Sequence, residues 1–301
     1  MSDRRVVIND VGPRDGLQNQ PHTLEPAQRA ALVRALFDAG LRHVEAGSFV
    51  SPRAVPQMAR TDEVLALFGP ADRARLSVLV PNDKGYAHAR AAGASRVALV
   101  LSATDTMSLR NIGMDARQVL EVARGIIGRA RAEGVIVQAY ISVAFECPFE
   151  GRVDPGVTEA LCAELLACGA NEVVIADTIG AAGPAAVRAL MGRLVQRHGA
   201  GVLAVHFHDT RAMGVANCYA ALDAGIRAFD GSIAGLGGCP FAPGASGNVA
   251  TEDVVLMLES CGMETGIDMD RLMAASRLAA ELTGNAPGPR ARAWLARRSA
   301  A

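Results

Sequence analysis

The chain has 301 residues, half of them apolar and 20% charged, with 30 basic against 31 acidic side chains and a formal net charge of −1. This composition is typical of a globular protein with a large core, and the balanced charge argues against a nucleic-acid or membrane-surface protein. The sequence has no apolar run of the ~20 residues that span a bilayer, and its first ten residues lack the apolar core of a secretory signal. We therefore expect a cytoplasmic protein that binds neither nucleic acid nor membrane.

The numbers and spacing of cysteine and lysine exclude several further classes of protein. The six cysteines do not have the spacing of a disulfide framework or of a zinc site, which agrees with a reducing compartment. Lys84 is the single lysine, and it does not lie in a GxxxxGK[ST] motif. The sequence therefore excludes the P-loop class of nucleotide-binding proteins. A Schiff-base aldolase would depend on Lys84, which we expect in a loop after Pro81 and not within a strand.

A helix that ends at glycine, followed at once by an apolar strand, is the clearest internal regularity. Glycine is favoured there because the residue after a helix often adopts a left-handed backbone conformation. With the apolar runs at 6–11 and 76–80, the pattern predicts strands that begin near residues 6, 43, 76, 96, 136, 172, 202 and 228. Helices are expected at 26–39, 116–132, 157–167 and 212–224. The glycines are Gly40, Gly93, Gly134, Gly169, Gly199 and Gly225.

Eight strand–helix units in about 280 residues predict an α/β fold, the (β/α)8 TIM barrel. A doubly wound sheet is the alternative, but its first strand usually leads into a glycine-rich phosphate turn, whereas this one leads into GPRDGLQ. No linker composition divides the chain. We predict a single domain over residues 1–301, with the barrel at about 5–250 and C-terminal helices at about 251–298 packed beside it.

Barrel enzymes place their chemistry at the C-terminal ends of the strands, so polar residues there are the candidates. His206 and His208 are two residues apart on one strand, and both imidazoles can therefore enter the barrel while Phe207 packs against the helices. Together with the Asp15 carboxylate they could hold Mg²⁺, Mn²⁺ or zinc. Two satisfied core histidines, with Asp15 in a surface ion pair, are the alternative. The other candidates at strand ends are Arg14, Glu45, Asn82, Tyr140, Ser142, Asp177, Asp230 and Ser232.

Two acidic residues have both a catalytic and a structural interpretation. Glu45 lies between Val44 and Ala46, where a carboxylate is costly unless it is paired or transfers protons. Arg14 is its natural ionic partner, so a structural ion pair is the alternative. Asp177 ends an apolar strand and could act as a base or cap the following helix.

The segment 235–248, after the last strand, contains five glycines and could close over the barrel mouth or approach a ligand with its backbone. Cys239 lies between Gly238 and Pro240 in this segment, a setting that does not suit core packing, so we predict a reactive thiol. The cysteines expected in helical, apolar core positions are Cys162, Cys168, Cys218 and Cys261, while Cys147 is expected in a loop.

The sequence resembles the 3-hydroxy-3-methylglutaryl-CoA lyases of the DRE-TIM metallolyase superfamily. The matching stretches are VGPRDGLQNQ (11–20), VEAGSFVSPRAVPQM (44–58), ADTIG (176–180), HFHDT (206–210) and AGLGGCPFAPGASGNVATED (234–253). The resemblance implies a metal-dependent carbon–carbon lyase that uses Mg²⁺ or Mn²⁺, acts on an acyl-CoA and forms a homodimer.

The same resemblance implies a role for individual residues. The cation would be held by Asp15, His206, His208 and Asn248. Arg14 would contact the thioester carbonyl, and Cys239 would be the active-site cysteine of the loop. Glu45 and Asp177 would belong to the acid–base network.

One departure from the family pattern leaves the acyl group open. After HFHDT the family usually continues Tyr-Gly-Gln-Ala, whereas this chain has Arg211-Ala212-Met213-Gly214, which adds a positive charge beside the predicted ligands. A lyase for a longer 3-substituted 3-hydroxyglutaryl-CoA therefore remains an alternative. Claisen-condensing synthases of the superfamily usually carry long C-terminal extensions and lack the GLGGCP cysteine. A barrel that only binds an acyl-CoA or a protein partner is the non-enzymatic alternative.

Overall fold

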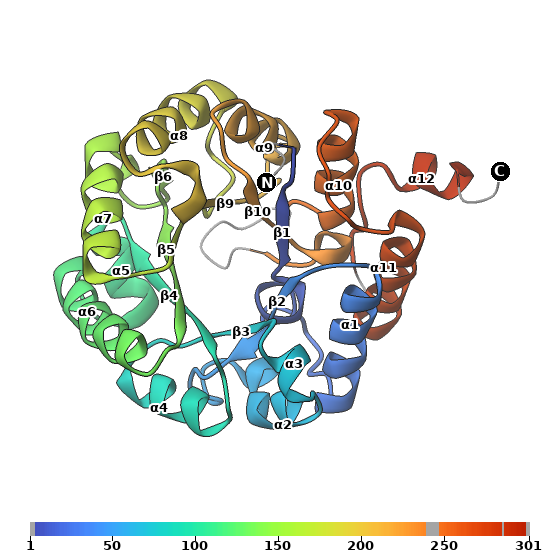
Figure 1. Cartoon of the computed structure of the whole chain (residues 1–301), viewed down its shortest axis with the longest axis horizontal. Helices are drawn as coiled ribbons and strands as arrows, with labels where there is room; N and C mark the ends of the chain where they lie inside the picture. Colours follow the sequence, from blue (N-terminus) through green and yellow to red (C-terminus); the bar gives the residue numbers. More distant parts are fainter. Residues whose placement is uncertain (1–3, 239–246, 285, 299–301) are drawn as a thin grey trace.

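The computed structural model describes residues 4–238, 247–284 and 286–298, and in this part of the chain eight parallel strands close into a barrel (Figure 1). Their order around the barrel is β1-β10-β9-β8-β5-β4-β3-β2. The predicted TIM barrel is confirmed, and the strands begin at or next to the predicted positions. The strands are β1 (Val7–Asp10), β2 (His43–Ser48), β3 (Leu76–Leu79), β4 (Arg96–Ser102), β5 (Ile136–Ser142), β8 (Glu172–Asp177), β9 (Leu203–Phe207) and β10 (Ala228–Gly231).

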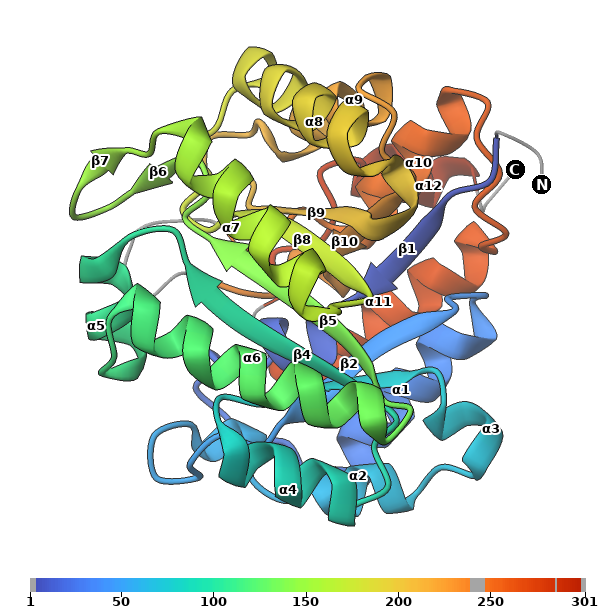
Figure 2. The same cartoon turned by 60° about the vertical axis from the view of Figure 1, so that its left-hand side comes forward.

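Helices surround the barrel on all sides (Figures 1 and 2). They include the four predicted helices. The helices are α1 (Pro26–Asp38), α2 (Thr61–Ala66), α3 (Pro70–Arg73), α4 (Asp83–Ala91), α5 (Asp105–Ile112), α6 (Ala116–Ala132), α7 (Pro155–Cys168), α8 (Pro184–His198) and α9 (Gly214–Asp223), with short turns η1 (Gly12–Gly16), η2 (Pro56–Met58), η3 (Ala200–Val202) and η4 (Ile233–Gly235). An antiparallel pair, β6 (Glu146–Cys147) and β7 (Gly151–Arg152), was not predicted.

Lys84 lies in the first turn of α4 and is exposed, so the expectation of a loop at this position was wrong. Asn82 caps this helix, its side chain accepting a hydrogen bond from the Gly85 amide at 3.0 Å. The described cavity lining does not include Lys84, which argues against a Schiff-base aldolase.

The six glycines predicted to end helices all have positive φ. The values run from +68° at Gly134 to +104° at Gly40 and Gly169. L side chains rarely adopt this region, so the backbone conformation explains why glycine recurs before the strands.

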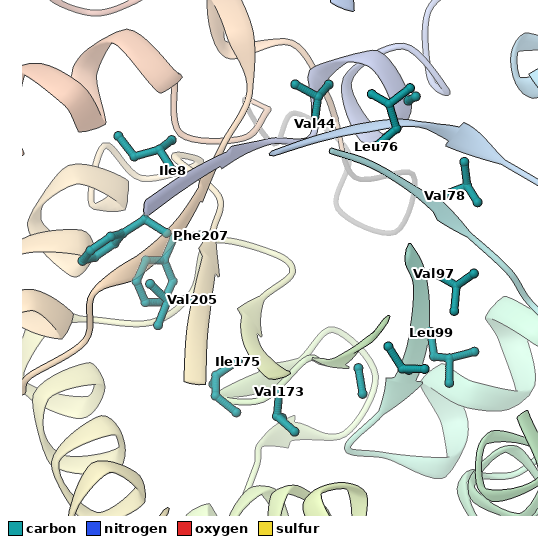
Figure 3. Close-up of a cluster of buried hydrophobic side chains, with 14 of the residues drawn as sticks. Ile8, Val44, Leu76, Val78, Val97, Leu99, Val173, Ile175, Val205 and Phe207 are labelled. Atoms are coloured by element: carbon teal, nitrogen blue, oxygen red, sulfur yellow. The ribbon is translucent and has the colours of Figure 1, made fainter. Parts of the chain in front are cut away.

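Apolar side chains on the outer face of the strands pack against the helices and form the main core (Figure 3). Phe207 belongs to this outer layer and is almost fully buried, as predicted. Because side chains alternate along a strand, its neighbour His206 faces the barrel interior. The packing of Phe207 thus helps to orient His206, a candidate metal-binding residue.

The predicted C-terminal helices are present as α10 (Thr251–Ser260), α11 (Met269–Thr283) and α12 (Arg292–Arg298), and they lie on the β1 side of the barrel (Figure 1). The helix α11 packs against α1, and α10 contacts β1 and β10. In the described part of the chain, none of the helices combines the length and the apolar character that a membrane crossing needs.

The strand β2 contains an irregularity between Glu45 and Gly47, where its register with β3 shifts. The fully buried guanidinium of Arg29 donates hydrogen bonds to the Ala46 carbonyl and to Thr61 Oγ1, both at 3.0 Å. Burial lowers the pKa of Arg29 to about 10. A bulge re-aims the side chains beside it, so this contact helps to determine where Glu45 points.

Gly47→Ala is expected to lower the free energy of unfolding by about 1–3 kcal/mol, the usual cost of overpacking a tight site. An added Cβ would clash with Arg29 Nη2 and lie 2.5 Å from Thr61 Oγ1, so one of these groups would have to shift. Urea denaturation measures the effect. Gly69→Ala is the control, because a Cβ there meets no described atom within 4 Å. Equal stability of the two variants would contradict this account of the bulge.

Candidate active site

The strand β1 leads directly into η1, a single π-helical turn that carries Arg14 and Asp15. The Val11 carbonyl accepts hydrogen bonds from the amides of Arg14 and Asp15 at 3.1 and 2.7 Å. Beneath this turn, buried Asp10 accepts hydrogen bonds from the Gly12 amide at 2.8 Å and from Thr251 Oγ1 at 2.6 Å. The first strand and α10 therefore fix the turn that presents two predicted site residues.

Arg14 is held between two carboxylates and is only 6% exposed. Its Nε donates to Glu45 Oε2 at 2.6 Å and its Nη1 donates to Asp15 Oδ1 at 2.5 Å. Burial lowers the pKa of Arg14, but the two carboxylates outweigh it and raise the pKa. Burial also raises the pKa of Glu45 to about 7, although the guanidinium opposes this rise. The predicted pair of Arg14 with Glu45 is present, and it fixes the guanidinium in one orientation.

Asp15, His206 and His208 form a cluster in which one potential ligand atom from each residue lies within 4.8 Å of the others. Burial would raise the pKa of Asp15, but Arg14 and the two imidazoles lower it to about 2. Burial lowers the pKa of His208 to about 4. Asp15 is therefore ionised and His208 neutral near pH 7, and these are the forms that bind a cation.

Asn248, the fourth predicted ligand, lies against this cluster. Its Nδ2 donates to Asp15 Oδ2 at 2.8 Å and to the Leu236 carbonyl at 3.2 Å. Asn248 Oδ1 and His208 Nδ1 are buried, and no described residue bonds either atom. Buried polar atoms are rarely left unpaired, so these two fit the ligand set of a cation. The structure brings the four predicted ligands together, and their role as ligands stays a prediction.

A cavity of ≈ 640 Å³ contains this cluster. Its described lining includes Arg14, Asp15, Tyr140, His206 and His208, together with apolar side chains from β3, β4 and α5. This arrangement places a fixed guanidinium and a potential cation site in a cavity whose remaining lining combines apolar and uncharged polar side chains.

Glu45 and Asp177, the two bases considered from the sequence, are not part of the described cavity lining. Glu45 is fully buried behind Arg14. The Asp177 carboxylate accepts hydrogen bonds from the amides of Ala181 and Ala182, both at 2.9 Å, and burial raises its pKa to about 6. That one of them takes a proton from a substrate stays a prediction. Asp177 ties down the turn after β8, which is close to the capping alternative.

Cys239 lies outside the described residues. Gly238, which precedes it, lines the cavity, and its carbonyl accepts a hydrogen bond from Asn19 Nδ2 at 2.8 Å.

The other cysteines agree with their predicted positions only in part. Cys162 and Cys218 are buried as predicted, but Cys168 is only half-buried. Cys261 is exposed, so its core assignment was wrong: it follows α10 at the protein surface. Cys147 is buried in β6 and not in a loop.

Arg211, the departure from the family pattern, is turned toward the loop after β8. Its guanidinium donates to the carbonyls of Gly180, Ala181 and Ala182, and the described cavity lining does not include it. The positive charge expected beside the ligands is therefore used to hold the loop that Asp177 also binds.

Four polar residues of the site region received no role from the sequence. Tyr140 and Asp230 lie at strand ends, so the sequence identifies them as candidates but gives neither of them a role. Asp10 shows the signal that drew attention to Glu45, an acid inside an apolar strand. Glu252 Oε1 accepts a hydrogen bond from the Ala234 amide at 3.0 Å, and only the fold reveals this contact.

A closed barrel with an Asp–His–His cluster and a buried arginine beside it defines a TIM-barrel protein with a possible metal site in a cavity at the strand ends. Comparison with known proteins makes this more specific: the HMGL-like family model matches residues 5–279, and the chain belongs to this family. The resemblance seen in the sequence is confirmed.

Relatives of the chain include the hydroxymethylglutaryl-CoA lyase of Pseudomonas mevalonii, 42% identical over 98% of both chains. The 3-hydroxy-3-isohexenylglutaryl-CoA/hydroxymethylglutaryl-CoA lyase of Pseudomonas aeruginosa is 41% identical over 96% of both. The structure of an HMG-CoA lyase from Acenitobacter baumannii in complex with coenzyme A and 3-methylmalate has a TM-score of 0.92 and 36% identity, covering 97% of this chain and 96% of that chain.

Asp10→Asn is expected to make stability less sensitive to pH. Burial raises the pKa of Asp10 to about 7, against an ordinary value of about 3.9. Because the folded protein binds the Asp10 proton more tightly than the unfolded chain does, Asp10 contributes its full stabilisation below about pH 4. This contribution to the free energy of unfolding is lost as the pH rises to about 7. Asparagine keeps an oxygen for the Gly12 amide and does not titrate.

The free energy of unfolding of the variant should therefore rise relative to wild type between pH 4 and 7 and level off above. Urea denaturation at several pH values measures this difference. A difference that does not vary with pH would show that Asp10 titrates normally in the folded protein.

Proposed function

We propose that the chain is a metal-dependent carbon–carbon lyase that cleaves 3-hydroxy-3-methylglutaryl-CoA to acetyl-CoA and acetoacetate. The observation that carries the proposal is Arg14, fixed between Glu45 and Asp15 beside the His–Asp cluster in the cavity. The HMGL-like family and the relatives named hydroxymethylglutaryl-CoA lyase support it. The coenzyme A in the Acenitobacter baumannii structure supports an acyl-CoA ligand.

The reaction breaks the bond between C2 and C3 of the acyl chain. The C3 hydroxyl loses its proton and becomes the ketone of acetoacetate, while the bonding electrons pass to C2 and the thioester oxygen as an enolate. The enolate then takes a proton at C2 and becomes the methyl group of acetyl-CoA. The site has three tasks: to accept one proton, to stabilise the enolate and to donate one proton.

Asp15, His206, His208 and Asn248 would hold the cation, and we propose Mg²⁺ or Mn²⁺ because carboxylate and amide oxygens complete the ligand set. When bound, such an ion supplies Lewis acidity to the substrate hydroxyl and carboxylate oxygens. The low pKa of Asp15 and the unpartnered Asn248 Oδ1 suit this role.

Arg14 would stabilise the enolate oxygen of the thioester. Two carboxylates fix its guanidinium before the substrate arrives, so little reorganisation is needed as negative charge develops. Glu45 acts through Arg14 as a positioning residue, and Asp177 acts through the turn that it holds at Ala181 and Ala182.

Asp15 lines the cavity, but as a proposed cation ligand with a pKa of about 2 it is a poor acceptor for the proton of the C3 hydroxyl. Glu45 and Asp177, whose pKa values burial raises to about 7 and about 6, stay the predicted candidates for the base. Cys239 would return a proton to the enolate, because a cysteine side chain is one of the groups that enzymes use for general acid catalysis. Its neighbour Gly238 is the last described residue before it and lines the cavity.

Removal of divalent cations tests the proposed function. Protein treated with excess chelator should release no acetyl-CoA from 3-hydroxy-3-methylglutaryl-CoA in a coupled assay, yet keep its thermal unfolding transition. Mg²⁺ or Mn²⁺ should restore turnover. Asp15→Asn, which removes a ligand charge at nearly constant volume, should stay inactive after the metal is added. Full activity in chelator would contradict a metallolyase.

Arg14→Lys is expected to lower kcat by about 10²–10³-fold, the usual cost of removing one donor from a developing oxyanion. KM should change much less, because the enolate charge is absent in the ground state. Lysine keeps the charge but cannot bridge Glu45 and Asp15 as a planar fork. Steady-state kinetics measure the split. A change confined to KM would mean that Arg14 only binds substrate or pairs with Glu45.

A substrate with a longer 3-substituent is the second candidate. The cavity of ≈ 640 Å³ has apolar lining from Leu79, Val100, Met107 and Ile112, which would suit a hydrocarbon chain. The Pseudomonas aeruginosa relative is named for both a methyl and an isohexenyl substrate. The acetyl-CoA assay, run with both thioesters, separates the candidates by the ratio of their kcat/KM values.

The homodimer and the cytoplasmic location stay predictions of the sequence. A Claisen-condensing synthase and a barrel that only binds acyl-CoA are the alternatives to the proposed lyase. Release of acetyl-CoA in the assay excludes the binding-only barrel. Sedimentation of the purified protein tests the homodimer.

A further inference from the structure

Asp230 lies inside the barrel near the end of β10 and is bonded to groups from three other strands. Its Oδ1 accepts a hydrogen bond from Asn9 Nδ2 on β1 at 3.0 Å. Its Oδ2 accepts a hydrogen bond from the Tyr140 hydroxyl on β5 at 2.8 Å. The same Oδ2 lies 3.2 Å from His206 Nδ1 on β9. The carboxylate is only 3% exposed, so these contacts are not exchanged for water.

The imidazole of His206 is thereby held at both ends. Nδ1 faces Asp230, and Nε2 lies 3.9 Å from Asp15 Oδ2 within the cluster. Asp230 accepts hydrogen bonds on both of its oxygens, so the imidazole that faces it is the donor. A proton on Nδ1 leaves the Nε2 lone pair free on the side of Asp15.

The ring of Tyr140 packs edge-on against His206, with centroids 6.0 Å apart and an angle of 77° between the planes. Tyr140 thus restricts the imidazole sideways while its hydroxyl holds Asp230. Groups that bind the second nitrogen of a histidine ligand commonly fix its tautomer and raise its basicity.

We propose that Asp230 is a positioning residue that sets the tautomer and orientation of His206, so that Nε2 is presented as a ligand for the cation. This inference rests on the cation site of the proposed function. In the proposed reaction, Asp230 neither binds the substrate nor transfers a proton.

Two variants test the assignment by metal affinity instead of activity. Asp230→Asn keeps the shape but removes the charge, and its affinity for Mn²⁺ should fall by about 10–100-fold, measured by titration calorimetry without substrate. Glu172→Gln is the matched control. Glu172 begins β8 at the opposite end of the barrel and accepts a hydrogen bond from Gln138 Nε2 at 2.6 Å, so its change should leave the affinity for Mn²⁺ unaltered. Thermal unfolding in chelator should be similar for both variants.

A measurement on the wild-type protein keeps the proposal testable if Asp230→Asn fails to fold. In the metal-free protein, ¹⁵N NMR of His206 should show a protonated Nδ1 and an unprotonated Nε2 in the neutral ring. A neutral ring protonated on Nε2 would overturn the proposal, as would an Asp230→Asn variant that binds Mn²⁺ as tightly as wild type. If wild-type protein does not bind Mn²⁺ at all, the proposed function fails and this inference fails with it. If wild type binds and the variant binds equally well, only the role of Asp230 is lost.

Discussion

A buried guanidinium between two carboxylates is the interaction on which the site depends. Arg14 cannot leave its position without abandoning Glu45 or Asp15 in a poorly solvated space, and an unpaired buried charge is far more costly than a paired one. The same pairing holds Asp15 ionised beside the two histidines. One set of hydrogen bonds therefore prepares both the guanidinium that we propose to stabilise the enolate and the proposed cation site.

Neighbouring elements hold Glu45 and Arg14 in the positions that this pairing requires. Glu45 is set by the irregularity in β2, where Arg29 binds the Ala46 carbonyl. The turn that carries Arg14 is held from below by Asp10, whose other oxygen binds Thr251 at the start of α10. The C-terminal helices beside the barrel thus contribute to the geometry of the site and not only to the size of the core.

The sequence predicts the barrel well because its signals are local and repeated. Glycine after each helix reflects a positive φ, and an apolar run reflects a strand buried on both faces. The pair His206 and His208 could be assigned inward because alternation along a strand is a fixed property of the backbone, and Phe207 packs outward as expected.

Other features depend on contacts that sequence spacing does not determine. Asp177 looked as suitable for a base as for a cap, and only the amides of Ala181 and Ala182 show which backbone groups it binds. Arg211 looked like an added charge at the mouth, but three carbonyls bind it elsewhere. The position of Asp230 between β1, β5 and β9 needs the closed barrel, because its partners are distant in the sequence.

Deuterium exchange into acetyl-CoA tests the central claim most directly, because it isolates the enolate from cleavage of the C2–C3 bond. In D₂O with saturating Mn²⁺, the wild-type protein should incorporate deuterium into the methyl group of acetyl-CoA, detected by mass spectrometry. Arg14→Lys should incorporate it at least about 100-fold more slowly, since the donor to the enolate oxygen is misplaced. Exchange by the lysine variant at the wild-type rate would contradict the account.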